Sequence, residues 1–173
     1  MKVIYEDNHI IIVNKLPGEI VQGDKTGDTP LVEIVKQWIK EKYAKPGNVF
    51  VGVAHRLDRP TSGVVVFAKT SKALSRLCDM FAHHDVKKLY WAVVKNAPKE
   101  DEKTLVNYLK RNEKQNKSFV VGKGVKDAKE AILTYRTIAK SDNYTLLEVD
   151  LATGRHHQIR CQLAAIGLPI KGD

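Results

Sequence analysis

Between two apolar runs, the chain reads His55-Arg56-Leu57-Asp58-Arg59-Pro60-Thr61-Ser62-Gly63. The flanking runs, residues 49–54 and 64–68, are rich in β-branched residues, so we expect two buried strands that hold the loop rigidly. Asp58 is the one acidic residue of this loop, and Arg56 and Arg59 lie on either side of it. Because nearby cations favour the charged form of a carboxyl, Asp58 is suited to act as a nucleophile or a base. The alternative is an Arg–Asp salt bridge that only stabilises a strand connection.

The chain is basic, with 29 Lys and Arg against 20 Asp and Glu among 173 residues and a formal net charge of +9. Such an excess favours a polyanionic partner, namely RNA, DNA or an anionic surface, through attraction and counterion release. The first residues are too polar for a secretory leader, and no apolar run approaches bilayer length, so we expect a cytoplasmic protein. Cys78 and Cys161 have no CxxC partner and are expected to be small core residues rather than disulfide or zinc ligands.

Periodicity predicts an α+β domain over residues 1–173, with a mixed, largely antiparallel sheet and a few helices. In the first half, short strands are expected at 3–5 and 10–13. A helix follows Thr29 as N-cap, with Pro30 in its first position and apolar residues at helical spacing. A second helix is expected to start at a Ser71 cap. Its apolar stripe consists of Leu74, Leu77, Cys78 and Phe81.

The residue pattern of the second half of the chain predicts several strands followed by one helix. The strands are expected at 89–94, 105–106, 118–121, 131–139 and 144–151. The helix should begin near Thr153 and stop at Gly167, with His156 and Arg160 on one polar face. Its inward residues would be Ile159, Leu163 and Ile166. The strand connections carry a basic set that forms a solvated face or borders an RNA path: Lys110, Arg111, Lys114, Lys117, Lys123, Lys126 and Lys129.

Several motifs resemble the RluA-type pseudouridine synthases, in the family's order. The loop at 55–63 and Ala68-Lys69 resemble the active-site signature His-Arg-Leu-Asp-x-x-Thr-Ser-Gly-x-x-x-x-Ala-Lys. Residues 88–92 resemble the motif Lys-x-Tyr-x-Ala, and 151–160 match Leu-x-Thr-Gly-Arg-x-His-Gln-Ile-Arg. Residues 14–22 resemble the family's opening motif with a shifted proline, and a Pro-Gly turn explains them equally well. The chain also resembles the family at its last residues, where relatives continue with a further segment that this chain is expected to lack.

This resemblance implies roles for individual residues. Asp58 would be the catalytic residue, Tyr90 would stack on the target base, and Arg160 would pair with the aspartate. Arg56 would occupy the place that the flipped uridine leaves. The residues expected to contact RNA are Arg56, Arg59, Thr61, Lys88, Arg155, His157 and Gln158.

The implied activity isomerises a uridine of ribosomal or transfer RNA to pseudouridine, with no cofactor and no metal site. We expect a monomer that binds RNA and no membrane, without a separate N-terminal RNA-binding domain. Whether Asp58 attacks the sugar or takes a proton from it stays open. The alternatives are a non-catalytic RNA-binding module or inactive short form, and a carboxylate glycosidase. The glycosidase is disfavoured because such enzymes need a second carboxylate, and no other acidic residue lies in a comparable loop.

Overall fold

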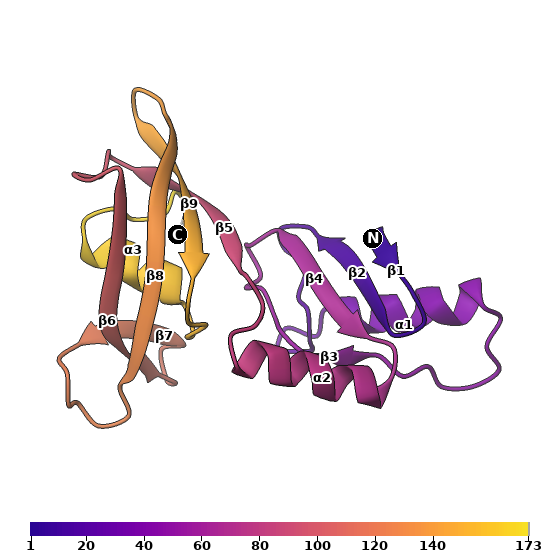
Figure 1. Ribbon diagram of the computed structural model, residues 1–173. Coiled ribbons are helices and arrows are strands. Elements are labelled where there is room, and N and C mark those ends of the chain that lie inside the picture. The colour runs from indigo at the N-terminus through magenta and orange to yellow at the C-terminus, as the bar shows by residue number, and fades with distance from the viewer. Residues whose placement is uncertain (173) are drawn as a thin grey trace. The chain divides into compact units, whose positions relative to one another are not determined.

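The computed structural model describes residues 1–172 and divides the chain into two compact units, one ending at Asp85 and one beginning at Val86 (Figure 1). Each unit contains its own antiparallel sheet and its own apolar core. The α+β class expected from the sequence is confirmed. The strands form two sheets rather than one mixed sheet, and every pairing among the named strands is antiparallel. The single domain over 1–173 stays a prediction.

The first unit has a four-stranded sheet in the order β1-β2-β4-β3. Its strands are β1 (Lys2–Glu6), β2 (Ile10–Lys15), β3 (Gly52–Val53) and β4 (Gly63–Ala68). The strands predicted at 3–5, 10–13 and 64–68 are confirmed, whereas the one predicted over 49–54 is limited to two residues. The reason is that Gly52 already pairs with Ala68, the last residue of β4, so the preceding residues have no partner there.

Helix α1 (Leu31–Lys42) packs against one face of this sheet, and its Leu31, Val35 and Ile39 are buried with residues of β2 and β4 (Figure 1). The predicted Thr29 cap is wrong, because Pro30 occupies the N-cap position and makes no side-chain cap bond. Main-chain carbonyls cap the helix instead. The Leu31 amide donates to the Ile20 carbonyl at 2.7 Å, and the Val32 amide donates to the Val21 carbonyl at 3.2 Å.

Helix α2 (Ser71–Ala82) is capped one residue earlier than predicted. The Ala73 amide donates to Thr70 Oγ1 at 3.1 Å, so Thr70, not Ser71, is the N-cap. The prediction that Cys78 is a core residue is also wrong, because Cys78 is exposed on this helix. Its neighbours in the predicted stripe, Leu74, Leu77 and Phe81, are half-buried.

The second unit has a five-stranded sheet in the order β5-β9-β8-β6-β7, with helix α3 (Gln158–Ala165) against one face (Figure 1). Leu163 of α3 is buried in a core with residues of β5, β6, β8 and β9. The predicted strands are confirmed, but several of them extend further than expected. Four of the basic residues expected in connections therefore lie on strands: Lys110 and Arg111 on β6, Lys117 on β7 and Lys129 on β8. The strands are β5 (Leu89–Lys95), β6 (Glu102–Asn112), β7 (Lys117–Val121), β8 (Lys129–Lys140) and β9 (Tyr144–Leu151).

The start of α3 differs from the prediction by five residues, because it begins at Gln158 rather than Thr153. The N-cap residue His157 has a left-handed backbone with φ of 52°, which separates the preceding loop from the helix. His156 therefore lies outside the helix, and its predicted place on a helical face with Arg160 is wrong. Ile166 is also not inward as predicted, since it is the C-cap residue and is 41% exposed.

Candidate active site

Asp58 is an exposed residue in the connection between β3 and β4. Main-chain hydrogen bonds shape this connection, because the Thr61 amide donates to the Asp58 carbonyl at 3.0 Å and the Gly18 amide donates to the Arg59 carbonyl at 2.8 Å. Gly63 ends the loop with φ of 139°, a conformation that only glycine adopts without strain. The loop is therefore tied both to itself and to the segment that follows β2.

Lys15, the last residue of β2, lies beneath this loop with none of its surface exposed. Its ammonium donates to main-chain carbonyls of the Asp58 loop, at 3.1 Å to Asp58, 3.0 Å to Arg59 and 2.6 Å to Thr61. A fourth carbonyl, that of Leu16, lies at 3.2 Å. Because a buried charge is tolerated only with such partners, Lys15 fixes the backbone that carries Asp58.

Lys15 is not among the site residues predicted from the sequence, although its position in the strand contains a signal. Along β2, Ile11, Val13 and Lys15 alternate as the buried residues, so the lysine occupies an inward position of a strand. Burial lowers the pKa of the Lys15 ammonium, while the carboxylates of Glu19 and Asp58 act in the opposite direction. Those two carboxylates favour the charged form that the surrounding carbonyls need.

The two arginines beside Asp58 have contacts elsewhere in the first unit. Arg59 forms ion pairs with Asp28 at 2.6 Å and with Asp24 at 3.3 Å, and it also donates to the Thr26 hydroxyl at 2.7 Å. Arg56 donates to Gln22 Oε1 at 3.4 Å. The guanidinium of Arg59 thus binds three residues of the segment 24–28, a contact that the sequence pattern does not predict. Thr61 contributes its carbonyl to the Lys15 site and is half-buried.

The other two predicted catalytic residues belong to the second unit. Tyr90 is a half-buried residue of β5 that packs against the second core, and Arg160 is a half-buried residue of α3. Lys88, just before β5, has a pKa lowered by burial. The Asp150 carboxylate counteracts this shift, and the Arg155 guanidinium adds to it. Positive charge from Lys88 and Arg155 is therefore concentrated beside the start of β5 and the end of β9.

Gln158 holds the loop before α3. Its Oε1 accepts from the Thr153 hydroxyl at 2.8 Å and from the Arg155 amide at 2.9 Å, while its Nε2 donates to the Ile132 carbonyl at 3.0 Å. Gln158 is only 3% exposed, so its side chain is used inside the protein rather than presented to RNA. Arg155 is also anchored, because its Nε donates to the Glu130 carbonyl at 2.9 Å.

His156 and His157 lie between this loop and α3 and stack on one another with ring centroids 3.8 Å apart. The Ser118 hydroxyl of β7 lies 2.9 Å from His156 Nδ1, and the Cys161 thiol of α3 donates to the Ser118 carbonyl at 2.8 Å. These contacts connect α3 to β7. Cys161, which was expected to be a core residue, is half-buried.

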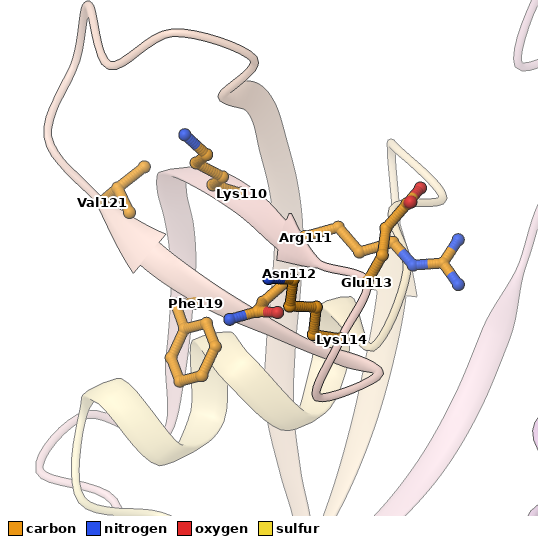
Figure 2. Close-up of a pocket in the computed structure, with 7 residues that line it drawn as sticks. All are labelled: Lys110, Arg111, Asn112, Glu113, Lys114, Phe119 and Val121. Atoms are coloured by element: carbon orange, nitrogen blue, oxygen red, sulfur yellow. The ribbon is translucent and has the colours of Figure 1, made fainter.

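A cavity of about 570 Å³ lies on the second unit between β6, β7 and the turn that joins them (Figure 2). Figure 2 shows cationic side chains around it together with the ring of Phe119. None of the predicted site residues is in its lining, which consists of Lys110, Arg111, Asn112, Glu113, Lys114, Phe119 and Val121. Its cations belong to the basic set noted in the sequence.

Within residues 1–172, no group of three or more His, Cys, Asp or Glu side chains is arranged to hold a metal ion. None of the helices described there is long and apolar enough to cross a membrane.

Comparison with known proteins gives the family. The model of the RNA pseudouridylate synthase family matches residues 9–165. The tRNA pseudouridine synthase C of Vibrio cholerae is 33% identical over 100% of this chain and 72% of its own length. The ribosomal large subunit pseudouridine synthase D of Zymomonas mobilis is 32% identical over 100% of this chain and 55% of its own length. The chain belongs to the RNA pseudouridylate synthase family, as the motifs at 55–69 and 151–160 predicted.

Solved structures agree on the fold. The human RNA pseudouridylate synthase domain containing 4 protein matches 99% of this chain and 67% of its own length, with a TM-score of 0.84 and 22% identity. At that identity the likeness establishes the fold alone. The chain spans between about half and three quarters of the curated relatives that it matches, 53% to 72% of their lengths.

Proposed function

We propose that this protein converts uridines of structured RNA into pseudouridine and that Asp58 is its catalytic residue. The observation that carries the proposal is the Asp58 loop, which resembles the family's active-site signature, lies within the residues that the family model matches, and has its backbone bound by the buried ammonium of Lys15. A carboxylate held on a rigid backbone is what a nucleophile or general base requires. Two relatives have names that specify transfer RNA and the large ribosomal subunit, so the proposed substrate belongs to one of these classes.

The reaction rearranges one nucleotide without gain or loss of atoms. The bond between C1′ of the ribose and N1 of uracil breaks, the base turns, and a new bond forms between C1′ and C5. The hydrogen on C5 leaves as a proton, and N1 gains one. The uridine must first leave its stack, which costs a few kcal/mol by the usual estimate for base flipping. Asp58 then acts on the ribose as nucleophile or as base.

In this proposal Tyr90 stacks on the extruded base and Arg160 pairs with the Asp58 carboxylate. An aromatic face binds any nucleobase, and a guanidinium holds a carboxylate through a bidentate pair. Arg56 fills the space that the uridine leaves in the RNA. No cofactor is part of the proposed chemistry, because the product is an isomer of the substrate.

RNA binding is proposed to depend on charge. Arg59, Thr61, Lys88, Arg155 and His157 are assigned to the RNA backbone, supported by the net charge of +9. Gln158 acts indirectly, because its buried amide holds the loop that carries Arg155. The protein is proposed to act as a monomer in the cytoplasm.

The experiment is a tritium-release assay on transcripts. Transfer RNA and ribosomal RNA transcribed in vitro with [5-³H]uridine contain no pseudouridine, and formation of the new bond at C5 releases tritium to water. We expect release from one of the two RNA classes and a pseudouridine at a defined position. Tight RNA binding without any release would instead support the non-catalytic binding module. Release from both classes at many positions would contradict specific recognition.

A further inference from the structure

His55 opens the loop that carries Asp58, and neither the family resemblance nor the proposed mechanism gives it a task. Its side chain nevertheless makes a long-range contact, because the Val66 amide of β4 donates to His55 Nε2 at 3.0 Å. A main-chain amide of a strand normally donates to a main-chain carbonyl of the neighbouring strand. Here an imidazole nitrogen takes the place of that carbonyl.

The sheet register explains which partner the imidazole replaces. β3 pairs with β4 through Gly52 opposite Ala68 and Val53 opposite Phe67. Continued by one residue, the same ladder would bring Ala54 opposite Val66. On β4, amides alternate between the two neighbouring strands, and the amide of Lys69, which follows β4, donates toward β2, to His9. The Val66 amide therefore faces the β3 side, where the ladder has ended.

A stacking contact fixes the orientation of the His55 ring. The ring lies against Phe81 of α2, with centroids 4.6 Å apart and an interplanar angle of 26°. Burial lowers the pKa of His55 to about 4, so the imidazole is neutral at neutral pH. Neutral imidazole has one nitrogen that accepts and one that carries hydrogen. Since Nε2 accepts from Val66, the hydrogen lies on Nδ1.

These contacts come at the point where the chain leaves the sheet, three residues before Asp58. Lys15 binds the carbonyls of Asp58, Arg59 and Thr61. It makes no such bond to residues 54–57, so the first part of the loop needs another anchor. The hydrogen bond between the Val66 amide and His55 is that anchor. A main-chain carbonyl in the same place would extend β3 by another residue, whereas the imidazole lets the chain leave the sheet.

We propose that His55 is a positioning residue: its neutral ring ends the β3–β4 ladder by accepting the Val66 amide, and so fixes where the Asp58 loop begins. The proposal rests on the proposed function only in that Asp58 is the catalytic group. Loss of the acceptor leaves the Val66 amide without its partner and lets residues 54–58 shift. A displacement of about 1 Å at a catalytic group lowers a rate about 10²-fold.

Two substitutions distinguish the effect of the hydrogen-bond acceptor from the effect of the aromatic ring. His55→Phe keeps a ring against Phe81 but removes the acceptor, and His55→Gln supplies an amide oxygen near the place of Nε2. The exposed His9, with the changes His9→Phe and His9→Gln, serves as the matched control. The assay measures tritium release from transfer RNA and ribosomal RNA transcripts that contain [5-³H]uridine. We expect kcat to fall about 10²-fold in His55→Phe with KM changed little, and His55→Gln to recover most of the loss.

A second measurement does not depend on catalysis. Amide hydrogen exchange at Val66, at residues 56–59 and at Thr61 should accelerate at least about tenfold in His55→Phe and return toward the wild-type rate in His55→Gln. Nitrogen NMR of the wild-type imidazole should show hydrogen on Nδ1. If the wild type releases no tritium while the exchange pattern holds, the proposed function fails and the role of His55 in the loop stands. Unchanged exchange in His55→Phe, or hydrogen on Nε2, would overturn the proposal.

Discussion

The ammonium of Lys15 lies 3.1 Å from the carbonyl oxygen of Asp58 and is fully buried. A lysine near a carboxylate is usually expected to pair with its side chain, but here the cation binds the main chain of Asp58, the proposed catalytic residue. Its remaining hydrogen bonds reach the carbonyls of Leu16, Arg59 and Thr61. These bonds fix the backbone that carries the Asp58 side chain. A fixed backbone keeps the geometry of an active site before the substrate binds.

Replacing Lys15 by methionine removes the donor for these carbonyls while keeping the length of the side chain. We expect Lys15→Met to lower the free energy of unfolding by about 2–4 kcal/mol, because several buried carbonyls lose their partner. Urea unfolding measures the loss. The control is Lys2→Met on the exposed edge strand β1, which should change stability by less than about 0.5 kcal/mol. Equal stability of the two variants would show that Lys15 does not hold the loop.

Glu6 predicts a pH effect on stability. Burial raises the pKa of its carboxyl, but hydrogen bonds from Lys42, Lys69 and Tyr43 outweigh burial, so the net pKa is lowered. A lowered pKa in the folded state means that the carboxylate stabilises the fold above the pKa of the unfolded chain. That contribution is lost as the pH falls through the folded pKa.

Glu6→Gln should therefore be less stable than wild type at pH 7, and the difference should shrink as the pH approaches 3. Urea unfolding at several pH values measures it. The exposed Glu102, changed to Gln, is the control and should leave the pH dependence as it is. A constant difference between Glu6→Gln and wild type across this range would contradict the assigned ion pairs.

The cavity beside β6 and β7 predicts a salt effect on RNA binding. If its cations contact phosphates, the double change Lys110→Ala with Lys114→Ala weakens binding to all RNA sequences and reduces the slope of log affinity against log salt by about 1–2. Filter binding of a transfer RNA transcript at several salt concentrations measures both. Glu113→Gln in the same lining removes a negative charge and should strengthen binding. An unchanged slope in the double variant would place the RNA elsewhere.

Removal of the Gln158 side chain should loosen the loop that precedes α3. Gln158→Ala removes the acceptor for the Arg155 amide and for the Thr153 hydroxyl, so we expect a loss of about 1–3 kcal/mol in stability. Hydrogen exchange at Arg155 should accelerate most. Gln115→Ala, in the exposed turn between β6 and β7, is the control. Comparable exchange at Arg155 in the two variants would contradict the role assigned to Gln158.

Most strands could be predicted from the sequence because short runs of apolar and β-branched residues, bounded by turn residues, indicate strands. The run Ile10–Val13 is one of them, but four consecutive apolar residues do not show which side of the strand is buried, and the structure places Ile11 and Val13 in the core. Helix starts were predicted less well. The carbonyls of Ile20 and Val21 cap α1 from about ten residues earlier in the chain, where periodicity gives no signal. The left-handed backbone of His157, which delays the start of α3 to Gln158, is not visible in the apolar pattern either.

The residues of the candidate site also differ in how well the sequence predicts them. The family signature around Asp58 is readable because it is contiguous, whereas Lys15 is 43 residues away along the chain, so its contact with the loop forms only when β2 and β4 pair. Arg59 was expected beside the Asp58 carboxylate, and the structure shows its ion pairs with Asp24 and Asp28. The catalytic assignments of Asp58, Tyr90 and Arg160 come from motif resemblance and stay predictions.

The most direct test of the catalytic role is Asp58→Asn. This change keeps the shape of the side chain but removes its negative charge, so it should leave the melting temperature and transfer RNA affinity near those of wild type. Tritium release from [5-³H]uridine transcripts should fall at least about 10³-fold, since neither nucleophilic attack nor proton abstraction is then possible. Release by Asp58→Asn at a rate close to wild type would contradict the account.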